Sequence, residues 1–156
     1  YQGHFIIAPS VSAEHGIEMK NGSPVEYSTT NGEQTEGRLF TVPAYQDIEM
    51  VYDLYSHVIK AAECLNTDSI FRQKLLIAKN KLLPLKIGRY GQLQEWIDDV
   101  DNPHDHHRHL AHLYALYPGN RISYTRTPAL AQAVRKSLEM RGKGKFGDRW
   151  PHTGGN

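Results

Sequence analysis

The chain has 156 residues, a length that suits one domain and is sufficient to bury a hydrophobic core. Its content of 39% hydrophobic and 22% charged residues is typical of folded globular proteins and excludes the disordered and fibrous classes. Eighteen Lys and Arg against seventeen Asp and Glu leave a net charge of +1, so we expect no nucleic acid partner. No apolar run approaches the roughly 20 residues that span a membrane, and we expect no membrane partner.

Cysteine usage and the chain ends give two further constraints. Cys64 is the only cysteine, which excludes an internal disulfide and a cysteine-based zinc site. No His and Asp arrangement accompanies it, so we interpret Cys64 as a packing residue. The chain begins at Tyr1 rather than at Met, and residues 150–156 are aromatic and rich in glycine. Both ends resemble cuts, and we expect the chain to be a piece of a longer protein.

The first forty residues carry turn signals rather than helical spacing. A short apolar run at 3–8 favours a buried extended segment. Asn-Gly pairs at 21–22 and 31–32 flank the β-prone residues 25–30. The sequence therefore predicts a short extended or hairpin segment near the N-terminus.

Beyond Pro43 the apolar residues recur every three or four positions, as in amphipathic helices. Pro84 ends the second of these stretches, and the short connection before it predicts an antiparallel pair. The last stretch has Thr127 as a candidate N-cap and Gly142 as a candidate C-cap. The spacing predicts helices over residues 48–62, 71–82, 105–117 and 128–141, with long loops between the pairs.

The densest polar cluster, residues 98–112, admits three interpretations. His109 and His112 share one face of the predicted helix, and His104, Asp105 and His107 lie close enough in sequence to complete a metal site with them. A polar site for a sugar or an anion is the second interpretation, and a solvated loop is the third. No His-Glu-x-x-His pattern supports the metal site, so we expect no metal and no cofactor.

Two further segments contain candidate functional residues. Glu95 and Trp96 form a carboxylate–indole pair of the kind that stacks on a sugar ring and binds its hydroxyls. A buried Trp96 that anchors a loop, with Glu95 capping a backbone amide, is the alternative. Glu14 follows a short apolar segment, where a partly dry pocket raises a carboxyl pKa as a general acid requires, although capping a turn is its commoner role.

Taken together, these segments resemble glycoside hydrolase family 95, the inverting α-L-fucosidases and their α-L-galactosidase relatives. The resemblance covers nearly the whole chain and depends on several motifs in the same order. The motifs are Ala8-Pro-Ser-Val-Ser-Ala-Glu14, Val42-Pro-Ala-Tyr-Gln-Asp47, Ile87-Gly-Arg-Tyr-Gly-Gln-Leu-Gln-Glu-Trp96, His107-Arg-His-Leu-Ala-His-Leu113, Leu116-Tyr-Pro-Gly119 and Ser137-Leu-Glu-Met-Arg-Gly142. Departures include Ala13, where the family usually has Pro, and His15, where it usually has Asn.

The resemblance implies an all-α fold that is part of an (α/α)6 barrel, with residues 1–156 as a single partial domain from its middle portion. It implies that Glu14 is the general acid and that Arg108 and His109 bind the sugar, and we place Glu95 and Trp96 in the same substrate-binding set. The family's general base, an Asp in a later segment, has no counterpart in this sequence. The expected function is hydrolysis of terminal α-L-fucosyl or α-L-galactosyl residues.

The same resemblance implies two partners, a fucosylated oligosaccharide as substrate and the rest of the parent catalytic domain. It also implies that the parent protein is secreted or periplasmic. A non-catalytic helical domain that binds carbohydrate or acts as a scaffold is the alternative function. Because half of a barrel lacks the base, we expect the chain alone to be inactive.

Overall fold

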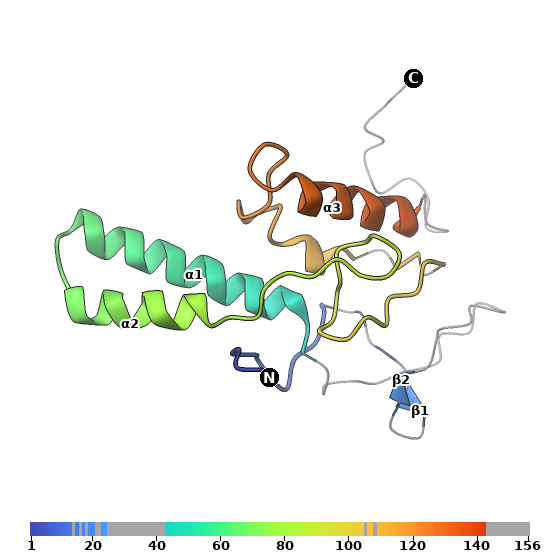
Figure 1. The fold of residues 1–156 in the computed structure, drawn as a ribbon, viewed down its shortest axis with the longest axis horizontal. Coiled ribbons are helices and arrows are strands. Elements are labelled where there is room, and N and C mark those ends of the chain that lie inside the picture. The colour runs from blue at the N-terminus through green and yellow to red at the C-terminus, as the bar shows by residue number, and fades with distance from the viewer. Residues whose placement is uncertain are drawn as a thin grey trace.

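The computed structural model describes residues 1–13, 15, 17, 19–20, 23–24, 43–104, 106–107 and 109–142. In these residues the fold is all-α, with three helices and long connecting loops (Figure 1). Two-residue strands β1 (Met19–Lys20) and β2 (Ser23–Pro24) form an antiparallel ladder in which Met19 pairs with Pro24. The all-α prediction with a short hairpin near the N-terminus is therefore confirmed, while the β-prone residues 25–30 lie outside the described residues.

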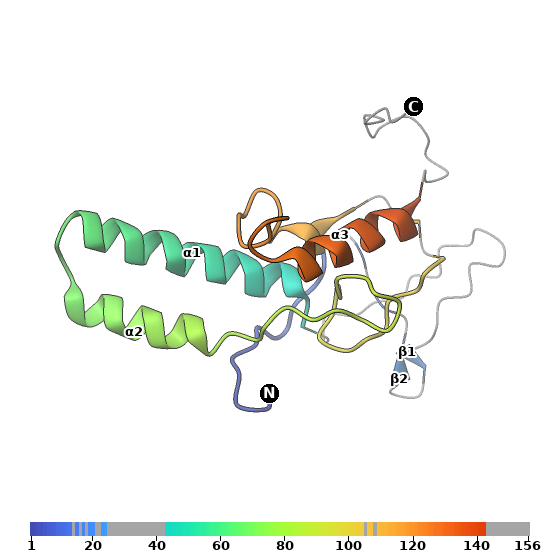
Figure 2. The same cartoon turned by 45° about the horizontal axis from the view of Figure 1, so that its top comes forward.

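Helices α1 (Tyr45–Cys64) and α2 (Ser69–Asn80) form an antiparallel hairpin that projects to one side of the molecule (Figures 1 and 2). The connection between them is short, and its residue Asp68 has a φ of 51°, which lets the chain reverse. The helices cover most of the predicted ranges 48–62 and 71–82. Their base packs against the loops through a cluster of Tyr45, Ile48, Leu82, Leu83 and Ile97.

Helix α3 (Pro128–Arg141) lies above those loops in the view of Figure 1. Thr127 occupies its N-cap position, Pro128 its first turn and Gly142, with a φ of +60°, its C-cap, as the sequence predicts. Its buried face contacts the loop at Leu93, whose backbone N–H donates to the Ala133 carbonyl (3.2 Å). The apolar cluster on this side comprises Leu93, Leu113, Ala115, Ile122, Ala133 and Val134.

The predicted helix over 105–117 is wrong. In the described part of this stretch the chain forms a short 3-10 helix, η1 (Ala111–Leu113), followed by turns. The backbone bonds there span three residues, as from Tyr114 to Ala111 and from Leu116 to Leu113, which gives a tighter coil than an α-helix. The preceding histidines also bond to distant backbone, since His106 reaches Arg141 (2.9 Å). Apolar spacing alone does not distinguish such a loop from a helix.

The N-terminal segment lies against the start of α1 and the loop that contains Trp96. Trp96 packs with Ile17 and Ala44 in a third apolar cluster, and Ala44 forms a β-bridge with Trp96. The Tyr45 backbone N–H donates to the Glu95 carbonyl (2.9 Å). Segments that are far apart in sequence thus meet where α1 begins. Among the helices described, none is long and apolar enough to cross a membrane.

Candidate active site

The Glu95 side chain is the centre of a buried polar cluster that joins three distant segments. Only 1% of this side chain is exposed. Ser12 donates its hydroxyl to Glu95 Oε1, and His15 Nδ1 donates to the same oxygen at 3.0 Å. Arg141, at the end of α3, forms an ion pair with Oε2. His112 Nδ1 lies 3.7 Å from Oε2, beyond hydrogen-bond range.

Glu95 is ionised at neutral pH although it is buried. Burial raises the pKa of its carboxyl, but His112, His15 and Arg141 together outweigh burial and hold the pKa well below its usual range. Burial lowers the pKa of His112 to about 4, and the neighbouring charge of Glu95 opposes that lowering. Arg141 and the hydrogen bonds from Ser12 and His15 stabilise the charge on Glu95 by direct contact.

A row of aromatic rings leads from Trp96 towards the surface. The Trp96 ring, 4% exposed, lies 4.9 Å from the His15 ring, measured between centroids. His15 stacks on His107 with centroids 4.3 Å apart and planes within 7° of parallel. His107 then meets His109 edge to face at 5.2 Å. The indole therefore supports a wall of three imidazoles rather than standing alone.

The segment around residue 13 is held from several sides. The His15 backbone N–H donates to the Ser12 carbonyl (2.7 Å), so these two residues are joined by backbone as well as through Glu95. The Ala13 N–H donates to the side-chain oxygen of Gln46 in α1 (2.7 Å). His109 Nδ1 donates to the Ala13 carbonyl (2.9 Å), across 96 positions of sequence. The turn is thus fixed both to α1 and to the histidine-rich loop.

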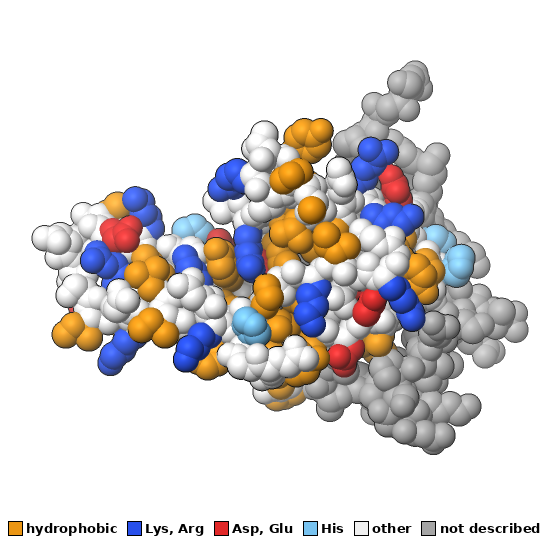
Figure 3. All heavy atoms as spheres, viewed as in Figure 1, with side chains coloured by type: hydrophobic (Ala, Val, Ile, Leu, Met, Phe, Trp, Pro, Cys, Tyr) orange, Lys and Arg blue, Asp and Glu red, His pale blue; other side chains and the backbone are white. Residues whose placement is uncertain are grey.

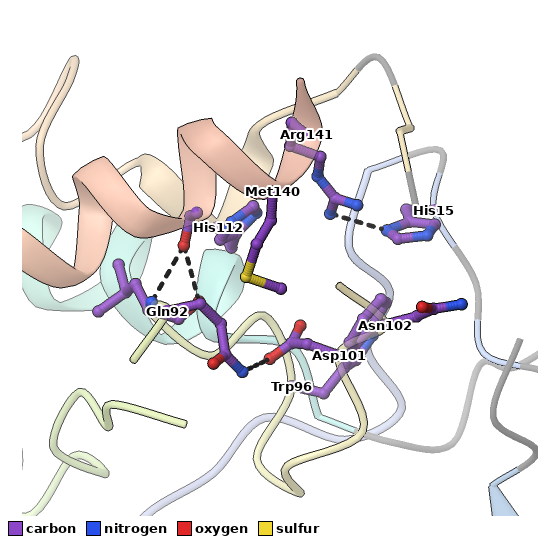
Figure 4. A pocket seen from close by; sticks show the side chains of 10 residues that line it. His15, Gln92, Trp96, Asp101, Asn102, His112, Met140 and Arg141 are labelled. Atoms are coloured by element: carbon purple, nitrogen blue, oxygen red, sulfur yellow. Dashed lines mark hydrogen bonds between the residues drawn. The ribbon is translucent and has the colours of Figure 1, made fainter. Parts of the chain in front are cut away.

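A small cavity of about 20 Å³ lies between the end of α3 and the loop of residues 92–102 (Figure 4). Figure 4 shows the Arg141 guanidinium directed towards His15, with the Gln92 amide donating to Asp101 below (2.8 Å). Burial raises the pKa of Asp101 to about 7; the Gln92 amide opposes this rise and the charge of Glu95 adds to it. A cavity of this size holds about one water molecule, so no sugar ring fits inside it. A wider groove of about 320 Å³, which shares Met140 with this cavity, adjoins it.

Of the predicted site residues, the structure brings Glu95, Trp96 and His109 together. His15 contacts both Glu95 and Trp96, and His107 links His15 to His109. Glu14 and Arg108 lie outside the described residues, so their predicted roles stay predictions.

Sequence reasoning missed Ser12, His15 and Arg141 as members of this cluster, and it considered His112 only within the polar segment 98–112, as a candidate metal ligand. Ser12 and His15 flank Glu14 within the first motif, and their polar character was the available signal. Nothing in the sequence indicated that Arg141 reaches Glu95 from 46 positions away.

The metal interpretation depended on convergence of the histidine-rich loop. Within the described residues, no group of three or more His, Cys, Asp or Glu side chains is arranged to hold a metal ion. Instead, His107 stacks on His15 and meets His109 edge to face, and the rings of His106 and His109 bond to backbone carbonyls. Asp105, one of the proposed ligands, lies outside the described residues.

Comparison with known proteins identifies the family. The family model described as the glycosyl hydrolase family 95 catalytic domain matches residues 1–153. The chain belongs to glycosyl hydrolase family 95. All motifs that carried the resemblance lie inside the matched range, including those that contribute Glu95, Trp96 and His109.

Proteins similar to this chain are named as fucosidases. The chain is 33% identical over 148 residues to alpha-L-fucosidase 2 of Arabidopsis thaliana, an alignment that covers 93% of the chain and 16% of that protein. It is 29% identical over 146 residues to probable alpha-fucosidase A of Aspergillus niger, covering 91% of the chain and 16% of the relative. The corresponding protein of Aspergillus oryzae is 26% identical over 156 residues, with 94% and 18% covered. The chain therefore spans less than a fifth of the length of these relatives.

Proposed function

We propose that this chain is the acid-bearing middle portion of an inverting exo-glycosidase that removes terminal α-L-fucosyl residues from glycans. Membership of family 95 and the names of the fucosidase relatives support a glycosidase that acts on fucosides. In this proposal Glu14 is the general acid, and Arg108 and His109 bind the sugar. The general base belongs to a part of the catalytic domain outside residues 1–156.

Inverting hydrolysis needs two carboxyl groups on opposite faces of the sugar ring. Glu14 donates its proton to the glycosidic oxygen as the bond from that oxygen to the anomeric carbon breaks. A carboxylate on the other face removes a proton from water, whose oxygen attacks the anomeric carbon and inverts its configuration. The proton given by Glu14 leaves with the aglycone alcohol, and the base carries the proton taken from water. Both groups return to their starting states by exchange with solvent.

The contact between His109 and Ala13 is the observation that supports this proposal most strongly. His109 belongs to the predicted sugar-binding pair, and Ala13 immediately precedes the proposed acid in the sequence. Their hydrogen bond of 2.9 Å joins two motifs that are remote along the chain. A glycosidase requires the acid and the sugar-binding groups at one surface, and this bond joins the segments that carry them.

The exposed apolar side chains of the α1–α2 hairpin support the proposal that the rest of the catalytic domain is a partner. Leu54, Ile70, Phe71 and Ile77 are each at least half exposed on α1 and α2. Figure 3 shows such hydrophobic side chains on the projecting hairpin, interleaved with lysines and arginines. Each helix of an (α/α)6 barrel is normally covered by its neighbours, so these side chains suit contact with the rest of the catalytic domain.

The experiment compares the whole protein that contains this chain with its Glu14→Gln variant on an α-L-fucosyl oligosaccharide. We expect the variant to lose about 10²- to 10⁴-fold in turnover, because general acid catalysis is worth that much. Glu63→Gln, an exposed glutamate near the end of α1, is the matched control and should retain full activity. NMR of the first product should show β-L-fucose.

Three results would contradict the proposal. They are unchanged turnover by Glu14→Gln, release of α-L-fucose first, and robust turnover by the isolated 156-residue chain that Glu14→Gln abolishes. The last result would place a base inside these residues.

A further inference from the structure

We propose that Glu95 is a positioning residue for general acid catalysis, which it serves by fixing the turn between Ser12 and His15 rather than by binding sugar. This inference rests on the proposed function, because Ala13 and the proposed acid Glu14 are the two residues between these anchors in sequence. It changes the role expected for Glu95 from a ligand of the substrate to a support beneath the site.

The burial of Glu95 argues against direct contact with sugar. Its side chain is 1% exposed, and each carboxylate oxygen already accepts from a protein donor. A sugar hydroxyl would have to displace Ser12, His15 or Arg141 from a buried anion, which would leave a buried donor unpaired and is therefore unfavourable. The nearby cavity of about 20 Å³ is also too small for a sugar ring.

The geometry gives Glu95 control of both ends of the turn. Ser12 is fully buried and donates to Oε1 from one end, and His15 donates to the same oxygen from the other. One atom of a side chain in a different loop therefore fixes the separation between residues 12 and 15. The other anchors, Gln46 and His109, bond to the backbone of Ala13 and constrain the middle of the turn.

The negative charge of Glu95 is needed as well as its shape. Two donors share Oε1, and the Arg141 guanidinium bonds to Oε2. A glutamine at this position has one oxygen and one NH₂ group. If its oxygen accepts from Ser12 and His15, its NH₂ faces the donating Arg141. If it faces the other way, the turn loses its acceptor. Glu95→Gln therefore releases either the turn or the end of α3.

A misplaced general acid has a kinetic signature that a general loss of structure does not produce. Oligosaccharide substrates release an alcohol, which needs protonation as the glycosidic bond breaks. α-L-Fucosyl fluoride releases fluoride, which departs without a proton from the enzyme. Loss of acid positioning thus lowers turnover of the oligosaccharide and spares the fluoride, whereas local unfolding or loss of the sugar site lowers both.

The test measures kcat and KM for both substrates in the whole protein and its variants. For Glu95→Gln we expect kcat on the oligosaccharide to fall about 100-fold, the cost of a misplacement near 1 Å, with KM nearly unchanged. On the fluoride kcat should fall by no more than about threefold, because that leaving group bypasses the acid. Glu14→Gln should show the same selectivity with a larger loss.

Glu49→Gln is the matched control. Glu49 is also 1% exposed and also pairs with an arginine, but its partner Arg121 belongs to a different segment from residues 12–15. We expect its kcat on both substrates to stay within about threefold of the unchanged protein. Ser12→Ala, which deletes one hydroxyl, is the second variant in case Glu95→Gln does not fold. Its kcat on the oligosaccharide should fall about tenfold, the equivalent of one hydrogen bond, and its kcat on the fluoride should not fall.

The outcomes separate this inference from the proposed function. If Glu14→Gln shows the leaving-group selectivity but Glu95→Gln and Ser12→Ala do not, the positioning role is wrong and the proposed function stands. Equal losses on both substrates in Glu95→Gln and in Ser12→Ala overturn the positioning role too. If the unchanged protein hydrolyses neither substrate, or Glu14→Gln is fully active, the proposed function fails and the positioning role fails with it.

Discussion

Two glutamates of this chain are equally buried and have opposite electrostatic behaviour. Glu95 and Glu49 are each 1% exposed, and each forms an ion pair with an arginine. The pKa of Glu95 lies well below its usual range, whereas burial raises the pKa of Glu49 to about 7 despite the opposing effect of Arg121. Burial is common to both, so the surroundings decide the charge.

The difference lies in the number and sign of the neighbouring groups. Glu95 accepts from Ser12, His15 and Arg141, which come from two segments remote from it. In the described residues Glu49 accepts a hydrogen bond from Arg121 Nη1 (2.6 Å), while the nearby Asp53 adds a repulsive charge. A buried carboxylate that gathers several donors stays charged and joins segments of the chain. A buried carboxylate with one donor and an acidic neighbour takes up a proton near neutrality.

Replacing each arginine in turn should give the largest difference in stability between the two regions. At pH 6, Arg141→Met leaves Glu95 as a buried charge without its ion pair, and we expect a loss of about 3–5 kcal/mol in unfolding free energy. Arg121→Met should lose less than about half of that, because Glu49 is mostly protonated at pH 6 and no charge is stranded. Urea unfolding of the whole protein measures both variants. Equal losses would show that the two carboxylates do not differ.

The pH dependence of stability separates the two glutamates further. The pKa of Glu49 rises from 4.5 to about 7 on folding, so the folded state binds more protons in this window and stability falls as pH rises through it. Glu49→Gln removes this pH-dependent contribution to the free energy of unfolding. Its stability relative to the unchanged protein should therefore increase by about 2–3 kcal/mol between pH 4.5 and pH 8.

The contribution of Glu95 to stability changes with pH in the opposite direction, because folding lowers the pKa of its carboxyl. Its contribution is complete above about pH 4.5 and disappears as pH falls through the folded pKa. Glu95→Gln should accordingly show no gain in relative stability between pH 4.5 and pH 8. Thermal unfolding midpoints across this range provide the measurement, and a gain in both variants would contradict the assignment.

Alanine substitutions at two glycines, one near Glu95 and one near Glu49, test which of the two regions affects activity. A Cβ at Gly88 would lie 2.1 Å from the Gln92 amide nitrogen and displace the Gln92–Asp101 pair, which contacts the Glu95 backbone (3.4 Å). A Cβ at Gly119 would lie 2.6 Å from the Tyr114 carbonyl, near Arg121. We expect each Ala variant to lose about 1–3 kcal/mol in stability. Turnover of the oligosaccharide should fall in Gly88→Ala alone; a fall in Gly119→Ala would connect the Glu49 region to the site.

The smallest expected effect concerns Tyr114. Its hydroxyl donates to Asp53 Oδ2 (3.2 Å) beside Glu49, and Tyr114→Phe deletes that bond. We expect a loss of about 0.5–1.5 kcal/mol and unchanged kinetics on the oligosaccharide. A change in kcat would mean that the two regions are not independent.

The sequence predicted the elements whose signals are local. The 3.6-residue spacing located α1 and α2, and Thr127, Pro128 and Gly142 marked the limits of α3, because caps act within one helical turn. The same spacing over 105–117 predicted a helix that does not form. There the histidines bond to residues far away in sequence, and such long-range contacts leave no local periodic signal.

The sequence predicted those residues of the candidate site that lie in recognisable motifs. Glu95, Trp96 and His109 were selected by residue type and by the family resemblance, and they are gathered at one place. The sequence did not indicate that Glu95 is buried or that Arg141 pairs with it. A side chain's exposure depends on what packs over it, and here the covering groups come from residues 12–15 and from the end of α3.

The charge state of the two glutamates is the central claim, and NMR of side-chain carboxyl carbons tests it most directly. Protein labelled with ¹³C at the glutamate carboxyls is titrated from pH 4.5 to pH 8, with Glu95→Gln and Glu49→Gln used to assign the two resonances. We predict that the Glu95 resonance keeps the chemical shift of an ionised carboxylate throughout, while the Glu49 resonance titrates near pH 7. A Glu95 resonance that titrates within this range, or a Glu49 resonance already ionised at pH 5, would contradict the account.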